Sequence, residues 1–448
     1  MRFTFILFLI LCSTAFVAPS FGVQIAIEVE PKGDWVEPGT HVDLASNVEI
    51  KPQVDDQPMI EVTVAAGEND RVNEVVSVRV QTDWEKTAIV LSGSDGRSYS
   101  GQLSAPSLNS SGEGNRQLTF VVPHLPAGET VTFTADGKVS DAEVAMKWDD
   151  DGVGEATLRF NGKQDVMKYM YAPLDETSEE SRGKTYKVYH HVYSPNGEEL
   201  VTKGPGGKFP HHRGLFYGFN RISYDGKKAD TWHCRNGAFQ SHKESVELLD
   251  GPLFGRNQVV IDWNGMDGKP FAREHREMTA MKIGEGTLIE FNSHLESLGA
   301  DIRLDGDPQH AGFQFRASQR VPDETAAKTF YIRPDGKGQP GKFRNWSAKK
   351  NETEQNLAHV NLPWNALNFW IGENNYTCCY LDLDSNPKES RFSERDYGRF
   401  GSYFEYDMTP EKPLNLRYRI WLQEGEMTVE EIDAMQKAFQ SPAATTVK

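Results

Sequence analysis

The segment "RQLTFVVPHLPAGETVTFTADG" (residues 116–137) decides the fold class of this chain. It holds two runs in which apolar or β-branched side chains alternate with polar ones, and Pro126 and Gly128 lie between them. Alternation with a period of two is typical of strands that bury one face, and Pro and Gly favour the turn that joins them. The segment therefore predicts two strands of an antiparallel sheet.

Similar runs occur upstream of this segment. "IEVTVAAG", "VVSVRVQTDW" and "TAIVLSGSDG" are separated by clusters of Gly, Asn, Asp and Pro at short spacing. Many short strands with frequent turns are typical of a small antiparallel sandwich. We predict such a β-sandwich module over residues 24–147, with a structural or accessory role because it concentrates few titratable groups suited to catalysis.

A longer β-rich region follows, over residues 153–440. Its strand candidates include "ATLRFNG", "KVYHHVYS", "GLFYGFNRISY", "NQVVIDW", "TLIEFNSHLESL", "AGFQFRAS", "NALNFWIG", "TCCYLDLD", "GSYFEYDM" and "LNLRYRIWLQ". One helix is expected, at residues 428–440, because Thr428 and Glu431 form a capping-box pattern. The predicted fold class is all-β: a small N-terminal antiparallel β-sandwich, then a large antiparallel β-sandwich or supersandwich. Residues 147–155 are interpreted as an acidic linker rather than a calcium site, and residues 441–448 as a loose tail.

The first 22 residues have the pattern of a secretory signal peptide. One basic residue precedes an apolar block, and small residues follow it near position 22. The predicted location is therefore secreted or periplasmic, and we expect no membrane span. A formal net charge of −17 disfavours a nucleic-acid partner, because such a surface repels phosphates. Removal of the signal leaves Cys234, Cys378 and Cys379, an odd number that we expect to remain as buried free thiols.

Histidines are concentrated in one quarter of the chain. Nine of the 12 lie between His190 and His310. Histidine is the common general acid or base near neutral pH, so this concentration indicates a pocket at the sheet surface. The alternative is that each imidazole only hydrogen-bonds its neighbours. His211 and His212 would face opposite ways on a strand, so they share a target only if the turn after Pro210 rotates the chain.

Other polar and aromatic groups accompany the histidines. "DTWHCRNG" supplies Trp232 and His233, and "GDPQHAGFQFR" supplies His310 and Arg316. Arginines and aromatic rings on a β-sheet suit a polyhydroxylated ligand, because rings stack on sugars and guanidinium groups fork onto hydroxyls or carboxylates.

Two further segments add charged candidates. Glu274 and Arg276 lie two residues apart, on either side of a histidine, so on a strand their side chains share one face. They are interpreted either as a charge pair of the site or as an ordinary surface ion pair of little energy. "SERDYGRFG" supplies Arg395 and Tyr397. The sequence contains no nucleophile elbow, phosphate loop or HExxH zinc motif.

These segments together resemble a known family. "VYHHVYSPNGEELVTKGPGGKFPHHRGLFYGFN", "DTWHC", "EHREMT", "GDPQHAGFQFR" and "SERDYGRFGSYFEYD" look like the PmoA-like family of mostly uncharacterised secreted bacterial proteins. The resemblance covers residues 155–425, and His211-His212-Arg213-Gly214 is its most specific motif. Phe209 stands where that family usually has a histidine. The resemblance implies a role in carbohydrate metabolism, and the succession of strands is similar to the supersandwich of aldose mutarotases.

Two hypotheses of function follow. The favoured one is an exported enzyme that acts on a sugar or oligosaccharide by His/Arg-based acid–base chemistry, of epimerase, lyase or hydrolase type. Its expected catalytic residues are His211, His212, His310 and Glu274. Its expected substrate-binding residues are Arg213, Trp232, His233, Arg276, Arg316, Arg395 and Tyr397. The alternative is a non-catalytic carbohydrate-binding or surface protein that presents Trp232, Trp346 and Trp370. No cofactor is assigned, and a divalent metal remains an open alternative.

Overall fold

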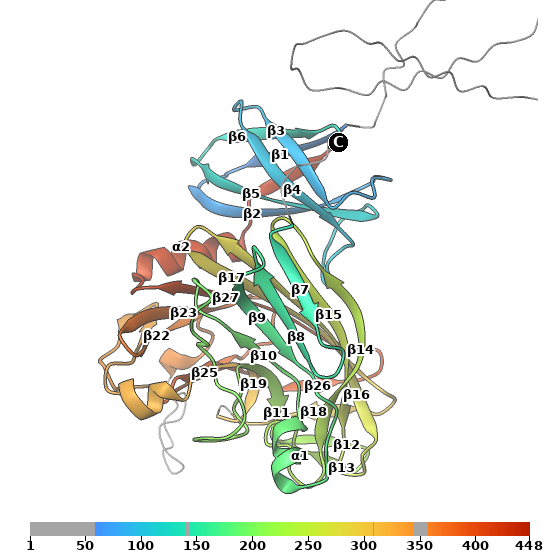
Figure 1. Cartoon of the computed structure of the whole chain (residues 1–448), viewed down its shortest axis with the longest axis vertical. Coiled ribbons are helices and arrows are strands. Elements are labelled where there is room, and N and C mark those ends of the chain that lie inside the picture. The colour runs from blue at the N-terminus through green and yellow to red at the C-terminus, as the bar shows by residue number, and fades with distance from the viewer. Residues whose placement is uncertain (1–58, 139–143, 308, 345–356) are drawn as a thin grey trace, which may run out of the picture. The chain divides into compact units, whose positions relative to one another are not determined.

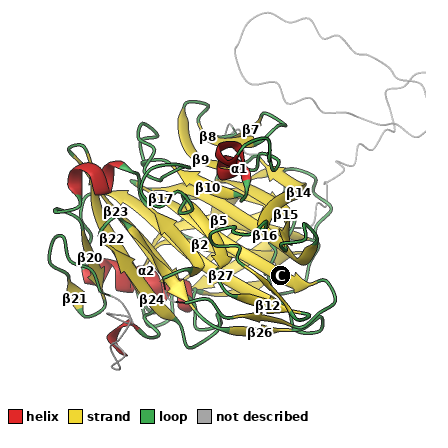
Figure 2. Cartoon of the chain, turned by 90° about the horizontal axis from the view of Figure 1, so that it is seen from below, coloured by secondary structure: helices red, strands yellow, loops and turns green. Residues whose placement is uncertain are grey.

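The computed structural model describes residues 59–138, 144–307, 309–344 and 357–448. The predicted signal peptide, the first part of the predicted N-terminal module and Trp346 lie outside these residues. All described residues belong to one unit, Gln57–Lys448. Antiparallel strands predominate, which confirms the all-β prediction (Figure 2). Within the described part of the chain, no helix is both long enough and apolar enough to cross a lipid bilayer.

The first sheet has seven strands in the order β2-β5-β4-β3-β6-β1-β28. Its strands are β1 (Ile60–Ala65), β2 (Arg71–Val80), β3 (Ala88–Gly93), β4 (Ser98–Ser104), β5 (Arg116–Leu125), β6 (Thr130–Ala135) and β28 (Ala444–Val447). The two strands expected from residues 116–137 are therefore β5 and β6. Their buried side chains, such as Leu118, Phe120 and Phe133, share one core with alternate residues of β1 to β4.

The last strand of this sheet comes from the expected tail. β28 pairs antiparallel with β1, from Val62 opposite Val447 to Ala65 opposite Ala444. The segment before it is held as well, because the backbone N–H of Ala443 donates to the buried carboxylate of Glu74 at 2.8 Å. The loose-tail interpretation is wrong: an edge strand forms through backbone bonds, which require no buried side chains.

The second sheet has eight strands in the order β24-β25-β19-β11-β10-β9-β8-β7 (Figure 1). Its strands are β7 (Met146–Asp150), β8 (Glu155–Phe160), β9 (Gln164–Met170), β10 (Tyr189–Val192), β11 (Leu215–Phe219), β19 (Ala311–Arg316), β24 (Arg391–Arg395) and β25 (Arg399–Tyr403). The linker expected at residues 147–155 is instead the β7–β8 hairpin, in which Asp151 Oδ1 accepts the N–H groups of Val153, Gly154 and Glu155.

The third sheet has nine strands in the order β14-β15-β16-β17-β27-β23-β22-β20-β21. Its strands are β14 (Phe239–Leu249), β15 (Phe254–Asn264), β16 (Pro270–Ile283), β17 (Gly286–Ser297), β20 (Phe330–Arg333), β21 (Gly336–Lys337), β22 (Trp364–Ile371), β23 (Asn374–Asp382) and β27 (Leu414–Glu424). A small four-stranded sheet contains β12 (Ile222–Tyr224), β13 (Lys227–Ala229), β18 (Ile302–Leu304) and β26 (Tyr406–Met408).

The largest core lies between the eight- and nine-stranded sheets. Phe313 of β19 stacks on Phe291 of β17 at 4.0 Å between ring centroids, and on Tyr418 of β27 at 5.6 Å. Tyr217 of β11 meets the same Phe291 at 5.8 Å. These contacts make the two sheets a sandwich, so alternate residues of β11 and β19 face away from this core.

Helices are few. The expected C-terminal helix is α2 (Val429–Gln440), and the capping box of Thr428 and Glu431 is present. A second helix, α1 (Glu179–Thr185), begins after Ser178, which caps it. It buries none of its residues, so no apolar periodicity predicted it. The described residues also form two short helical turns, η1 (Val321–Thr325) and η2 (Leu357–His359). The three cysteines of the described residues are free and buried, as expected.

Candidate functional site

The site is built on the outward face of the eight-stranded sheet. Tyr217 and Phe219 of β11 point into the sandwich core, so Phe216, which precedes Tyr217, points outward, where it meets Trp232 at 4.7 Å between rings. On the neighbouring β19, Gln314 and Arg316 alternate with core phenylalanines in the same way. The loop before β11, the loop after β13 and the loop before β19 cover this face.

The His211-His212-Arg213-Gly214 motif forms the first of these loops. The backbone N–H of His212 donates to the carbonyl of Phe209 at 3.0 Å, so residues 209–212 form a turn and not a strand. This turn rotates the chain after Pro210, as is required for His211 and His212 to face the same ligand. The imidazoles of His211 and His212 consequently lie together, 4.2 Å apart between ring centroids.

Gly214 closes the motif because no side chain fits there. Its φ of 43° lies in the left-handed region, and a Cβ would lie 2.0 Å from the carbonyl oxygen of His190 on β10. The motif glycine thus lets the loop approach the adjacent strand.

We expect Gly214→Ala to lower the free energy of unfolding by about 3 kcal/mol, since backbone strain and steric overlap add. Gly162→Ala is the matched control, because its φ is 69° and nothing lies within 4 Å of its Cβ. That change should cost only about 1 kcal/mol. Urea unfolding of both variants measures the difference, and equal losses would contradict the steric argument.

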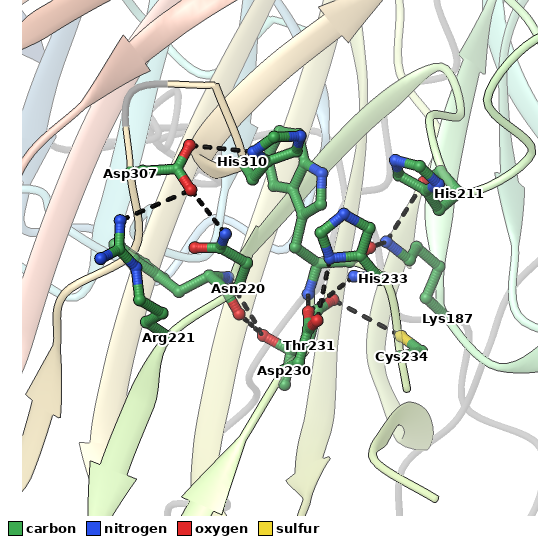
Figure 3. A network of polar contacts seen from close by, with 12 residues as sticks. Lys187, His211, Asn220, Arg221, Asp230, Thr231, His233, Cys234, Asp307 and His310 are labelled. Carbon is green, nitrogen blue, oxygen red and sulfur yellow. Dashed lines mark hydrogen bonds and ion pairs between the residues drawn. The ribbon is translucent and has the colours of Figure 1, made fainter. Parts of the chain in front are cut away.

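Two similar turns each place a carboxylate on a histidine (Figure 3). His233 Nδ1 lies 2.8 Å from Asp230 Oδ2, and His310 Nδ1 lies 2.9 Å from Asp307 Oδ1. In both turns the same aspartate also accepts backbone N–H groups, from His233 to Asp230 at 2.7 Å and from Gln309 to Asp307 at 3.0 Å. Neither aspartate is among the site residues predicted from the sequence, although the spacing Asp-x-x-His, which occurs in both segments, was a signal for them.

The two Asp–His pairs meet. The ring centroids of His233 and His310 are 5.1 Å apart, and His211 lies 4.5 Å from His233 on its other side. Figure 3 shows these three imidazoles gathered between Asp307 and Lys187. The structure therefore brings together four predicted site residues, namely His211, His212, His233 and His310. Trp232 lies beneath them, with its ring 5.5 Å from His212 and 6.1 Å from His310.

The inner part of the cluster is electrically unusual. Burial, followed by the charge of Lys187, lowers the pKa of His211 to about 2, and burial with the charge of Arg399 holds the pKa of His212 well below its usual value. Both imidazoles are neutral at pH 7. Nε2 of His211 and both ring nitrogens of His212 are buried without a hydrogen-bond partner among the described residues.

The outer pairs are more accessible. The His310 side chain is 34% exposed, and that of His233 is 10% exposed. Burial alone would raise the pKa of Asp307, but hydrogen bonds from His310 and Asn220 outweigh it and lower that pKa. Asp307 is therefore an anion at neutral pH and can hold the Nδ1 proton of His310. The reactive Nε2 atoms then face away from the carboxylates.

Two buried lysines hold the loop from below. Lys187 donates to the carbonyls of His211 and Trp232, and burial lowers its pKa to about 8. Lys203 donates to the carbonyl of Gly204 at 3.0 Å and lies 3.4 Å from that of His212; burial lowers its pKa to about 7. Both lysines donate to backbone carbonyls of the histidine loop or its neighbours, so they position the histidines. Sequence analysis missed them because lysine is rarely buried.

An aromatic ring joins the histidines to a group of arginines. Tyr397 lies parallel to the His212 ring at 5.9 Å, and its other contacts include Phe209 at 4.8 Å and the guanidinium of Arg316 at 4.9 Å. Arg399 of β25 is the cross-strand partner of Arg316. Tyr397 and Arg316, both predicted for the site, thus lie beside the histidine cluster.

The remaining predicted residues lie elsewhere or serve the framework. Arg213 donates to the carbonyls of Gly183 and Lys184 at the end of α1 and packs on Tyr186 at 4.3 Å. Such cation contacts suit a helix C-terminus. Arg395 donates to the carbonyl of Glu394 at 2.7 Å, next to the arginine group but without a contact to an imidazole among the described residues.

Glu274 and Arg276 are not brought to the histidines. They pair on the core face of β16, with Nε–Oε1 and NH2–Oε2 distances of 2.8 Å, and Glu274 also accepts from Trp263 and Ser293. Neither side chain is more than 1% exposed, so the surface-ion-pair interpretation is wrong. Each part of the carboxylate is already used inside the sandwich.

Four of the other five histidines of the concentration form two separate groups, and the fifth, His191, meets Tyr189 at 5.0 Å. His190 stacks on Tyr169 at 4.7 Å, and His242 meets the same tyrosine at 5.7 Å. His275 and His294 lie side by side on β16 and β17, 6.1 Å apart. Among the described residues, no group of three or more His, Cys, Asp or Glu side chains is arranged to hold a metal ion.

Comparisons with known proteins give a family and a set of distant structures. No curated protein matches the chain. An α-mannosidase from Enterococcus faecalis V583 has a TM-score of 0.44 and 8% identity, over 87% of this chain and 46% of the other. A glycosyl hydrolase family 38 protein from Enterococcus faecalis has a TM-score of 0.42 and 8% identity, over 87% and 47%. The chain thus spans about half the length of these structures.

The family comparison covers the whole candidate site. A model described as "Family of unknown function (DUF6807)" matches residues 155–437. This range contains β8 to β27, with every residue of the histidine cluster and both Asp–His pairs. The chain therefore belongs to the family of unknown function DUF6807.

Proposed function

We propose that this protein is an exported enzyme of carbohydrate metabolism that transfers protons on a sugar, with His233 and His310 as its acid–base pair. One observation carries the proposal: two aspartate-oriented imidazoles lie 5.1 Å apart on the outward sheet face, and one of them, His310, has a side chain that is 34% exposed. Export and the PmoA-like resemblance stay predictions from the sequence.

The pairs suit proton transfer for a chemical reason. A neutral imidazole that donates its Nδ1 proton to a carboxylate keeps Nε2 as a base, and the carboxylate stabilises the imidazolium after proton uptake. His233 with Asp230 and His310 with Asp307 both have this arrangement. One imidazole in the neutral form and one in the charged form provide a base and an acid. Positioned groups of this kind accelerate reactions by about 10²- to 10⁴-fold.

The spacing limits how the two groups meet a sugar. A sugar ring held between two imidazoles would need a contact distance of about 3.5–4 Å to each of them, so the imidazoles would have to lie about 7–8 Å apart. The two centroids are only 5.1 Å apart. Both imidazoles therefore approach the ligand from the same side. This favours proton transfer at neighbouring atoms of one sugar residue, such as two oxygens on one carbon.

The alternative of a non-catalytic carbohydrate-binding protein has less support. Of the three tryptophans that its platform would present, Trp232 is wholly buried and Trp370 is half-buried against Phe330 at 6.1 Å, while Trp346 lies outside the described residues. An aromatic platform works by presenting a free ring face to the sugar.

The test is a turnover screen. The purified protein is incubated with aldoses, uronates and oligosaccharides, and proton NMR follows anomeric exchange, new reducing ends and new vinyl signals. We expect conversion of at least one sugar, lowered at least about 100-fold in His310→Gln and in His233→Gln. His294→Gln is the matched control, because His294 bonds Asn415 at 2.7 Å on another sheet. Conversion that persists unchanged in both site variants would refute the assignment.

A further inference from the structure

Two buried arginines beside the histidine cluster lack a counter-charge. Arg316 and Arg399 are fully buried cross-strand neighbours on β19 and β25. Among the residues that the structure describes, neither forms an ion pair. Arg316 NH1 donates to the carbonyls of Ala317 and Tyr397. Arg399 donates to the side chains of Gln314 at 2.9 Å and Ser393 at 3.0 Å, which are both neutral.

Buried arginines such as Arg276 and Arg333 are paired with carboxylates, and the buried Arg213 donates to three backbone carbonyls instead. Arg276 forks onto Glu274 with two bonds of 2.8 Å, and Arg333 forks onto Glu394 at 2.7 Å for the Nε bond. A buried charge without a partner is costly, so protein interiors pair charges or hydrogen-bond them fully. Arg316 and Arg399 are neither paired nor fully hydrogen-bonded, because each has at least one guanidinium nitrogen without a partner among the described residues.

The unpaired atoms have a specific geometry. Nε and NH2 of Arg316 make no hydrogen bond with the described residues, while NH1 is anchored. These two atoms are one side of the guanidinium, the side that binds a carboxylate through two parallel bonds. Nε of Arg399 and both ring nitrogens of His212 are likewise unpartnered and buried. Unpartnered polar atoms of Arg316, Arg399 and His212 thus lie in one part of the sheet face, near Tyr397.

We propose that this place binds the anionic group of the substrate, so that the ligand is an acidic sugar, such as a uronic acid residue, held by Arg316 and Arg399. This assignment rests on the proposed function and names its substrate class. His212 donates one further N–H to the anion, and the cluster of His211, His233 and His310 receives the adjoining part of the ligand. Burial and then nearby groups including Arg399 keep the pKa of Arg316 near 10, which still leaves it charged at pH 7.

The anion reaches the arginines after a cover moves. Lys208 and Phe209 pack on the ring of Tyr397, at 5.1 Å and 4.8 Å, and Tyr397 lies on Arg316. Phe209 is exposed, and its φ of 57° lies in the left-handed region. Gly206 and Gly207, shortly before it, also have a φ in this region. Displacement of Phe209 relieves that conformation and leaves Lys208 at the entrance, where its charge attracts an anion.

The experiment compares matched sugars at constant ionic strength. Calorimetric titration uses D-glucuronate and glucose 6-sulfate against D-glucose, and D-galacturonate against D-galactose. We expect the anionic sugars to bind at least 10-fold more tightly than the neutral ones. Arg316→Gln should lower this ratio to about one. Arg320→Gln should keep it, since Arg320 is an exposed arginine that pairs with Glu324 at 3.3 Å.

A second measurement needs no ligand. Because the Arg316 fork is unpaired, Arg316→Gln should change the Tm of the unliganded protein by less than about 2 °C, whereas Arg276→Gln, which strands Glu274, should lower it far more. Equal binding of acidic and neutral sugars by the wild type, or binding of none of them, would overturn the anion site. Turnover of a neutral sugar that is lost in His310→Gln would keep the proposed function and overturn only this inference.

Discussion

The free energy of unfolding of this protein is expected to fall steeply below pH 6.5, by up to about 7 kcal/mol for each pH unit. Five histidines share the cause. Burial is the first reason that the pKa is lowered to about 3 for His190, about 4 for His191, about 2 for His211 and about 3 for His359, and well below 6.5 for His212. The unfolded chain binds protons at these imidazoles below pH 6.5 and the folded chain does not, so acid favours unfolding.

The window runs from pH 6.5, the unfolded value, down to about pH 4, where His191 is half protonated in the folded state. An ordinary stability of about 5–15 kcal/mol would largely be lost within it. Urea unfolding at half-unit pH steps measures the slope. His190→Phe, which keeps a ring on Tyr169, should reduce the slope by about one fifth. The half-exposed His275 is the control in His275→Gln, and a stability that is constant from pH 7 to 4.5 would contradict the prediction.

Asp307→Asn is expected to lower turnover by about 10²- to 10⁴-fold while the protein stays folded, because an amide no longer fixes the Nδ1–H tautomer of His310 or stabilises its imidazolium. Asn220 and Arg221 also contact this carboxylate, at 2.7 Å and 3.5 Å, so the change acts on one network (Figure 3). Steady-state kinetics should show the loss in kcat more than in KM, because the imidazole stays in place.

A control variant at another carboxylate distinguishes the orientation of His310 by Asp307 from the mere loss of one negative charge. Asp262 pairs with Arg273 at 2.8 Å on the nine-stranded sheet, away from the cluster, so Asp262→Asn removes one negative charge without touching the pair. Its turnover should equal that of the wild type. If the two aspartate variants behave alike, Asp307 does not orient His310 for catalysis.

Much of the fold could be predicted because side-chain alternation records burial directly. The runs that became β5, β6, β17 and β27 alternate or are apolar throughout, and Thr428 marked the start of α2. The prediction failed where structure depends on the backbone. β28 buries no side chain, and α1 depends on its cap at Ser178.

The candidate site could be predicted only in part. Its histidines were found because imidazoles are rare and gather in one region of the chain. Three loops bring them together over β11, and that arrangement follows from sheet order, which sequence periodicity does not contain. Glu274 was chosen because a charge near histidines suggests catalysis, yet strand alternation at β16 turns it into the core. Asp307 could have been found from its spacing to His310.

The most direct test measures binding and turnover of the same sugar by the same protein. Titration calorimetry and NMR turnover are run on the wild type, His233→Gln, His310→Gln and the control His294→Gln. The account predicts that both site variants bind the sugar within about 10-fold of the wild type and lose turnover by about 100-fold or more. A wild type that binds the sugar and never converts it, or site variants that convert it at the wild-type rate, would contradict the central claim that the paired imidazoles transfer protons.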